Sequence, residues 1–95
     1  MVSNMLLPKE FTLTPAYPNP FNPVTTLSFA LPVTSNVLLE VYDINGILIN
    51  ELIKSNMDAG YHSVIWKADN NAIGVYFVKM VARDFVNTQK LMLVK

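Results

Sequence analysis

The side chains that could perform acid–base or nucleophilic catalysis are few in this sequence. Its single histidine, His62, alternates with Val64 and Trp66, so we expect a half-buried edge histidine bonded to the backbone rather than a general base or metal ligand. No serine lies in the G-x-S-x-G pattern of a strained nucleophile turn. The absence of cysteine removes thiolate nucleophiles, thiolate metal sites and disulfide bonds. The sequence therefore predicts a protein that is not an enzyme and requires no cofactor.

Two oxygen-rich runs could supply ligands to a cation. Asp43-Ile44-Asn45-Gly46 has part of the alternation of a calcium loop, and Asp69-Asn70-Asn71 offers further side-chain oxygens. A complete loop needs more acidic ligands and a bidentate Glu at its end, and neither run has them. Asp and Asn also favour turns, where their side chains bond to the nearby backbone. We therefore favour turns, with calcium binding as the alternative.

Exposed aromatic side chains would allow a different chemistry, the stacking of sugar rings. A carbohydrate-binding face would require Tyr61, Trp66 or Tyr76 to lie on an exposed planar surface. Trp66 shares the face of Val64 in its alternating segment, so we expect it to anchor the core.

The most unusual segment is the proline-rich run 17–23, Tyr17-Pro18-Asn19-Pro20-Phe21-Asn22-Pro23. Its prolines fix φ, remove backbone donors and disfavour helix at the preceding residue, so the run cannot be a central strand. We expect a rigid corner in which Asn19 and Asn22 form Asx-turns and Phe21 closes one end of the core. A segment ordered before binding loses less entropy on binding, which makes this corner a candidate for recognition.

The segments that must hold these residues alternate as β-strands do. We expect strands near residues 10–14, 25–31, 37–41, 47–49, 60–66, 74–80 and 85–94. Residues 74–80 are apolar on both faces, which is typical of a central strand. Asn45-Gly46 predicts a tight hairpin turn, because both residues tolerate positive φ. Seven short strands in 95 residues predict an all-β, two-sheet, immunoglobulin-like sandwich whose strand order the pattern does not reveal.

Composition limits the partners. The chain is 52% hydrophobic and only 15% charged, with a net charge of zero, so it has no basic excess for nucleic acid. Its mean hydropathy of +0.32 with no net charge favours an apolar docking face or a strand-exchanged homodimer. We expect residues 1–10 to be an N-terminal linker or tail, without the features of a signal peptide, and residues 11–95 to be one domain.

Five ordered motifs together resemble the C-terminal sorting domains of the type IX secretion system. They are the proline-rich run with Thr25 and Leu27-x-Phe29-x-Leu31, Val41-Tyr42-Asp43-x-x-Gly46, Ala59-Gly60-x-His62-x-Val64-x-Trp66, Gly74-Val75-Tyr76-Phe77, and Thr88-x-Lys90-x-Met92-x-x-Lys95. The resemblance covers residues 11–95. A related domain shape occurs in flagellar hook-capping proteins, which lack the sorting role.

The resemblance implies an immunoglobulin-like address label on a larger protein, exported by a Gram-negative bacterium through the periplasm to the cell surface or the medium. The implied partners are an N-terminal cargo domain, the outer-membrane translocon and a sortase-like protease that removes the label. The residues expected to be recognised are Pro18, Asn19, Pro20, Phe21, Asn22, Pro23, Gly74, Val75, Tyr76, Phe77, Lys90 and Lys95.

The expected mode of recognition is docking by shape and by strand edge. The last strand could offer its backbone to a partner sheet, while its lysines discourage indiscriminate pairing. Two alternatives remain: a carbohydrate-binding accessory module of a secreted enzyme, and a purely structural spacer.

Overall fold

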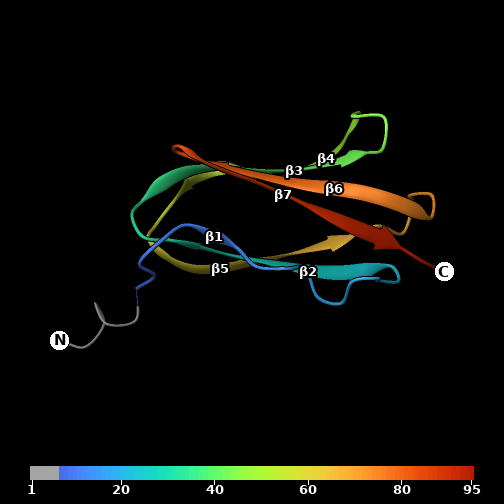
Figure 1. Cartoon of the computed structure of the whole chain (residues 1–95), viewed down its shortest axis with the longest axis horizontal. Helices are drawn as coiled ribbons and strands as arrows, with labels where there is room; N and C mark the ends of the chain where they lie inside the picture. The colour runs from blue at the N-terminus through green and yellow to red at the C-terminus, as the bar shows by residue number, and fades with distance from the viewer. Residues whose placement is uncertain (1–6) are drawn as a thin grey trace.

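The computed structural model describes residues 7–95 and contains two antiparallel sheets (Figure 1). The strands are β1 (Thr12–Leu13), β2 (Val24–Leu31), β3 (Ser35–Asp43), β4 (Leu48–Met57), β5 (Gly60–Lys67), β6 (Gly74–Ala82) and β7 (Phe85–Leu93). One sheet has the order β1-β2-β5 and the other the order β4-β3-β6-β7. The predicted all-β, seven-stranded, immunoglobulin-like sandwich is confirmed, and β6 is an internal strand as expected.

The core lies between the two sheets and is built from the alternation read in the sequence. Every second residue of β2, β3 and β6 points inward, because successive side chains of a strand alternate between faces. The largest fully buried side chains include Trp66, Phe21, Phe29, Leu27, Leu31, Leu39 and Met80. Trp66 is only 2% exposed, which confirms its predicted role as the core anchor.

The turn between β3 and β4 differs in detail from the prediction. The central residues of the turn are Ile44 and Asn45, because the Gly46 amide donates to the Asp43 carbonyl over 3.0 Å. Among the residues of this turn, only Gly46 has a positive φ, of 79°. The loop is therefore a type I turn followed by a glycine bulge, not a two-residue turn with positive φ at both Asn45 and Gly46. The Asp43 carboxylate accepts from the amides of Asn45 and Ile47 and so closes the turn.

The strand at the N-terminal edge is shorter than predicted. β1 pairs with β2 only through Thr12 and Leu13, although the Thr14 amide still donates to the Ser28 carbonyl. The next residue is Pro15, which has no amide to continue the ladder. From there the chain passes into the proline-rich run.

The sandwich is elongated, with extents of 47 × 22 × 16 Å. Figure 1 shows the β3–β4 turn, the β5–β6 connection, the start of β2 and the C-terminus at one end of the molecule. The first described residues, together with the start of β1, lie at the other end. The chain therefore enters the domain far from the place where its C-terminus lies.

Candidate recognition site

The structure brings three segments that are far apart in the sequence to one corner of the sandwich. In the ladder between β6 and β7, Gly74 pairs with Leu93 and Phe77 pairs with Lys90. On the other side of β7, Phe21 of the proline-rich run forms a parallel bridge with Leu93. The proline-rich run, the first half of β6 and the C-terminal strand thus lie side by side, and we call this place the C-terminal corner.

Asn19 fastens the proline-rich run to β7. Its side-chain amide donates to the Lys90 carbonyl, and its side-chain oxygen accepts from the Met92 amide, each over 3.0 Å. These two bonds take the place of the backbone hydrogen bonds that an adjacent strand would make with β7. The predicted Asx-turn at Asn19 is therefore wrong, because the side chain reaches a distant strand instead of the local backbone. Asn22 forms no side-chain hydrogen bond to any residue in the described part of the chain.

Phe21 continues the attachment with its backbone. Its amide donates to the Met92 carbonyl and its carbonyl accepts from the Val94 amide, both over 2.9 Å. Phe21 and Asn19 together form hydrogen bonds with the outward-facing backbone groups of the last strand, from the Lys90 carbonyl to the Val94 amide. The expectation that this part of the last strand offers a free edge to another sheet is therefore wrong. From residue 86 to residue 89, β7 has no such attachment to the proline-rich run in the described structure.

Aromatic packing beneath the corner fixes the shape of its surface. The Phe21 ring is 1% exposed and lies 5.5 Å from the Trp66 ring, measured between centroids. Trp66 in turn meets Tyr76 edge-on at 5.3 Å, and its indole donates to the Asn50 side-chain oxygen. Phe21 closes the end of the core, as predicted, because its side chain is buried among rings that both sheets supply.

Further hydrogen bonds hold the two ends of the proline-rich run. The Thr25 hydroxyl donates to the Pro18 carbonyl over 2.7 Å, and the Ala68 amide donates to the Pro23 carbonyl over 2.8 Å. The peptide bonds before Pro18, Pro20 and Pro23 are cis. The two hydrogen bonds hold the run in place as the corner that the sequence predicts, and its rigidity stays a prediction.

Gln89 joins β7 to the opposite sheet just before the corner. Its side-chain amide donates to the carbonyls of Leu13 and Thr14, and its oxygen accepts from the Ala16 amide. Sequence reasoning missed this residue, because a glutamine in an alternating strand has no local feature that distinguishes a bridging side chain from a solvated one.

Tyr76 acts as a structural residue within the predicted recognition set. It is 6% exposed, and its hydroxyl donates to the Ala72 carbonyl four residues earlier. This is the tyrosine corner of immunoglobulin-like folds, in which a tyrosine near the start of the sixth strand bonds back to the preceding connection. Phe21 and Tyr76 therefore shape the corner from inside and cannot meet a partner directly.

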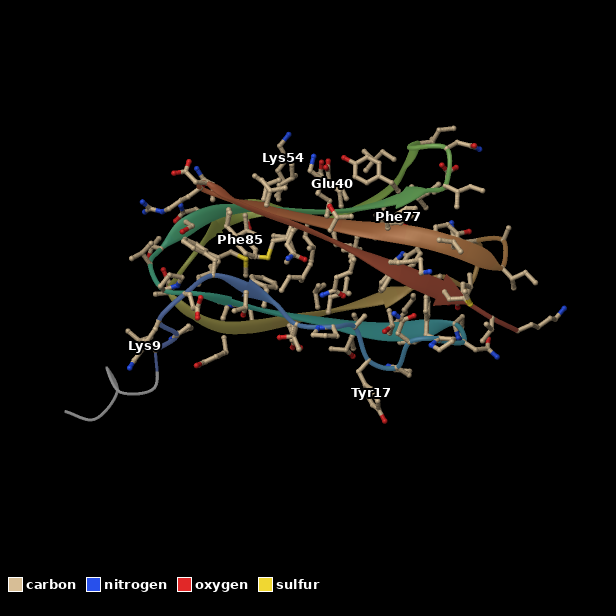
Figure 2. All side chains as sticks on the ribbon, viewed as in Figure 1. Lys9, Tyr17, Glu40, Lys54, Phe77 and Phe85 are labelled. Atoms are coloured by element: carbon tan, nitrogen blue, oxygen red, sulfur yellow. The ribbon has the colours of Figure 1, made fainter. Side chains whose placement is uncertain are left out.

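The remaining predicted residues differ in their accessibility. Pro23, Val75 and Phe77 are partly buried, and Phe77 lies on the outer face of the four-stranded sheet, where Figure 2 labels it. The exposed members of the set are Pro18, Asn19, Pro20, Asn22, Gly74, Lys90 and Lys95. These residues are the ones that a partner can reach while the domain stays folded.

A shallow hollow of about 250 Å³ lies where the segments of the corner meet. It is lined by Asn22 and Pro23, by Asp69 and Ile73 of the β5–β6 connection, and by the last residues up to Lys95. A second hollow of about 220 Å³ contains Ile44 and Ile73, whose side chains are 68% and 64% exposed. Sequence reasoning did not place these isoleucines at the site. An apolar side chain within a turn or loop could have indicated an exposed apolar patch, which often marks an interaction site.

The other candidate residues have structural explanations. The ring of His62 is bonded to the Asp58 carbonyl over 2.8 Å and stacks on Phe29, which confirms the edge histidine. Trp66 and Tyr76 are buried, so neither can form a sugar-binding surface, whereas Tyr61 is 71% exposed.

Among residues 7–95, no group of three His, Cys, Asp or Glu side chains is placed to hold a metal ion. Within the same residues, no helix is long and apolar enough to cross a bilayer.

Comparison with known proteins agrees with this architecture. The sequence model of one protein family, described as "Secretion system C-terminal sorting domain", matches residues 15–95. No curated protein and no solved structure was found to be significantly similar. The family match includes every segment of the C-terminal corner and ends at the last residue. The chain therefore belongs to the family of C-terminal sorting domains of the type IX secretion system, which act as sorting signals for the cargo proteins that carry them.

Proposed function

We propose that the secretion machinery recognises the C-terminal corner as one preformed surface, made by the proline-rich run, the first half of β6 and the end of β7, with the β5–β6 connection beside them. Family membership implies contact with the type IX machinery, attachment to a cargo protein and export to the cell surface or the medium. The finer proposal names the surface. The observation that carries it is the double attachment of Asn19 and Phe21 to β7.

This attachment supports recognition by shape and side chains. A partner that added a strand along residues 90–94 would first have to break the bonds that Asn19 and Phe21 make. A partner that reads the exposed side chains finds them already ordered, so binding costs little conformational entropy. The two lysines at 90 and 95 add positive charge at the rim of this surface, where charge chiefly affects specificity and association rate.

The position of the corner also suits a label attached to cargo. The first described residues lie at the end of the sandwich opposite the corner (Figure 1), so a cargo domain joined at the N-terminus would connect at that far end. The corner thus stays accessible when the domain is carried by a larger protein. We propose that residues 1–10 act as the linker, that the domain itself performs no catalysis, and that a sortase-like protease acts on this linker after export through the periplasm of a Gram-negative cell.

The experiment that tests the surface compares two double variants of equal charge. The chain is fused behind a reporter that carries an inner-membrane export signal, in a cell with a functional type IX system. Lys90→Glu with Lys95→Glu changes the corner, whereas Lys9→Glu with Lys54→Glu makes the same change in charge elsewhere. Figure 2 shows Lys9 near the first described residues and Lys54 on the outer face of the four-stranded sheet.

We expect the corner variant to leave reporter in the periplasm and the control variant to export it like the unmodified chain. All four lysines are exposed, so we expect each substitution to change stability by about 0.5 kcal/mol or less, and equal urea unfolding of the two variants checks that loss of export does not come from unfolding. Equal export by the two variants would contradict the proposed surface. It would leave the sorting role of the whole domain intact.

A further inference from the structure

The outer face of the three-stranded sheet lies, apart from Tyr17, outside the surface proposed for sorting. Along β2 the side chains that point away from the core are those of Val24, Thr26, Ser28 and Ala30. On one side of β2, strand β5 presents Tyr61, Ser63, Ile65 and Lys67 on this face. On the other side of β2, β1 and the residues after it present Thr12, Thr14 and Tyr17 on the same face. Within these described segments the face carries one charge, that of Lys67 at its end. The four-stranded sheet, in contrast, bears several charged residues on its outer face.

A hollow of about 290 Å³ lies in this face, and five of the residues that line it carry hydroxyl groups, beside Phe29, Ala30 and His62. The hydroxyls are those of Thr12, Thr14, Ser28, Tyr61 and Ser63. None of them has a hydrogen-bond partner elsewhere in residues 7–95, while every buried side-chain polar atom described does have one. Each hydroxyl can both donate and accept, so the hollow offers a set of free donors and acceptors.

Two exposed aromatic rings flank this set of hydroxyls. Tyr61 is 71% exposed and Tyr17 is 80% exposed, and Figure 2 shows Tyr17 pointing away from the sandwich. Tyr17 pairs with Thr26, and Tyr61 pairs with Ala30 on the other side of β2. The two tyrosines are therefore offset by four residues along the strand direction and by two strand spacings across the sheet, which places their Cα atoms about 17 Å apart. A tyrosine ring offers a flat apolar surface with a polar tip.

We propose that this face binds a neutral glycan, with one sugar unit on the Tyr61 ring above the hollow and a longer chain reaching Tyr17. The chemistry selects this class of ligand. Free hydroxyls match the donors and acceptors of a sugar, and exposed tyrosine rings match its apolar C–H face. A lone lysine is too little for a nucleic acid or a polyanion, and the serine and threonine rows are unlike the core of a protein interface.

The test uses the 95-residue chain and two-dimensional amide NMR with four neutral hexasaccharides: maltohexaose, cellohexaose, xylohexaose and mannohexaose. We expect at least one to cause saturable shifts at Thr12, Ser28, Tyr61 and Ser63. The substitution Tyr61→Ala weakens binding about tenfold through loss of ring stacking, whereas Tyr61→Phe retains most of it. Ile73→Ala, which removes a side chain of similar exposure, 64% against 71% for Tyr61, beside the C-terminal corner, leaves binding unchanged.

The spacing of the two rings gives a second readout. Tyr17→Ala should weaken binding of the hexasaccharide but not of the matching disaccharide, which is too short to span from Tyr61 to Tyr17. The proposal is overturned if none of the four probes shifts these amides at about 10 mM, or if hexagalacturonate binds there as tightly as the neutral probes. Because the measurement needs no cell, its failure leaves the sorting function untouched, and Tyr61→Ala fusions should still be exported.

Discussion

Replacement of Phe21 by alanine tests the attachment of the proline-rich run to the core. The ring is 1% exposed and packs against Trp66, and removal of a buried phenyl group costs about 3–5 kcal/mol. A domain of this size has a free energy of unfolding of roughly 5–14 kcal/mol. The substitution should therefore remove a large part of the stability and lower the midpoint temperature by roughly 12–40 °C.

The assay follows the fluorescence of Trp66, the single tryptophan of the chain, during urea unfolding. Trp66 contacts Phe21 directly, so its signal reports on the same packing. Tyr17→Ala is the matched control, because Tyr17 belongs to the same run but is 80% exposed, and we expect a change within about 0.5 kcal/mol. If Phe21→Ala is too unstable to measure, Phe21→Leu should still cost about 1 kcal/mol. A loss no greater than that of the control would refute the packing described for this corner.

Three further substitutions test other contacts. Asn19→Ala should cost about 1–2 kcal/mol in urea unfolding through loss of two hydrogen bonds to β7, whereas Asn22→Ala should cost nearly nothing; equal effects would show that Asn19 does not fasten the run. Gly46→Ala should cost about 1–2 kcal/mol, because the φ of 79° strains any side chain although the surroundings are open; a neutral result would contradict the glycine bulge. The hydrogen bond from the Tyr42 hydroxyl to Glu40, desolvation by burial, and the Glu40 charge raise the pKa of Tyr42. The contribution of this pair to stability is therefore complete below the ordinary tyrosine pKa near 10 and is lost as the pH rises through the folded-state pKa. Absorbance titration should show Tyr42 ionising above that value and Glu40→Gln, which removes the carboxylate charge, reducing the shift; an unchanged titration would exclude the contact.

Alternation along the strands was enough to predict the sandwich, because the period of two is a local property of the chain. Leu27, Phe29 and Leu31 alternate with polar or small residues and prove to be buried. The strand order could not be predicted from the pattern. The chain passes from one sheet to the other after β2, after β4 and after β5, and the order depends on which strand edges then meet. The turn at Gly46 was placed correctly, but its type depends on hydrogen bonds of Asp43 that residue preferences do not specify.

The candidate site was predicted as separate motifs and not as one surface. Proline chemistry identified the rigid run and the role of Phe21, because both follow from local sequence. The contacts of Asn19 with Lys90 and Met92 join residues more than 70 positions apart, and no feature near Asn19 predicts them. Tyr76 was assigned to recognition because its motif is one of those that carry the family resemblance, whereas its hydroxyl in fact closes a structural corner. Assignment of each member of the recognition set to an actual contact remains a prediction.

Export of a passenger protein tests the sorting function most directly. A reporter with an inner-membrane export signal is joined to the N-terminus of this chain and expressed in two otherwise identical strains, one of which lacks the type IX translocon. The account predicts reporter on the surface or in the medium of the competent strain, and retention of reporter in the periplasm of the other. Retention in both strains, or export from both, would contradict it.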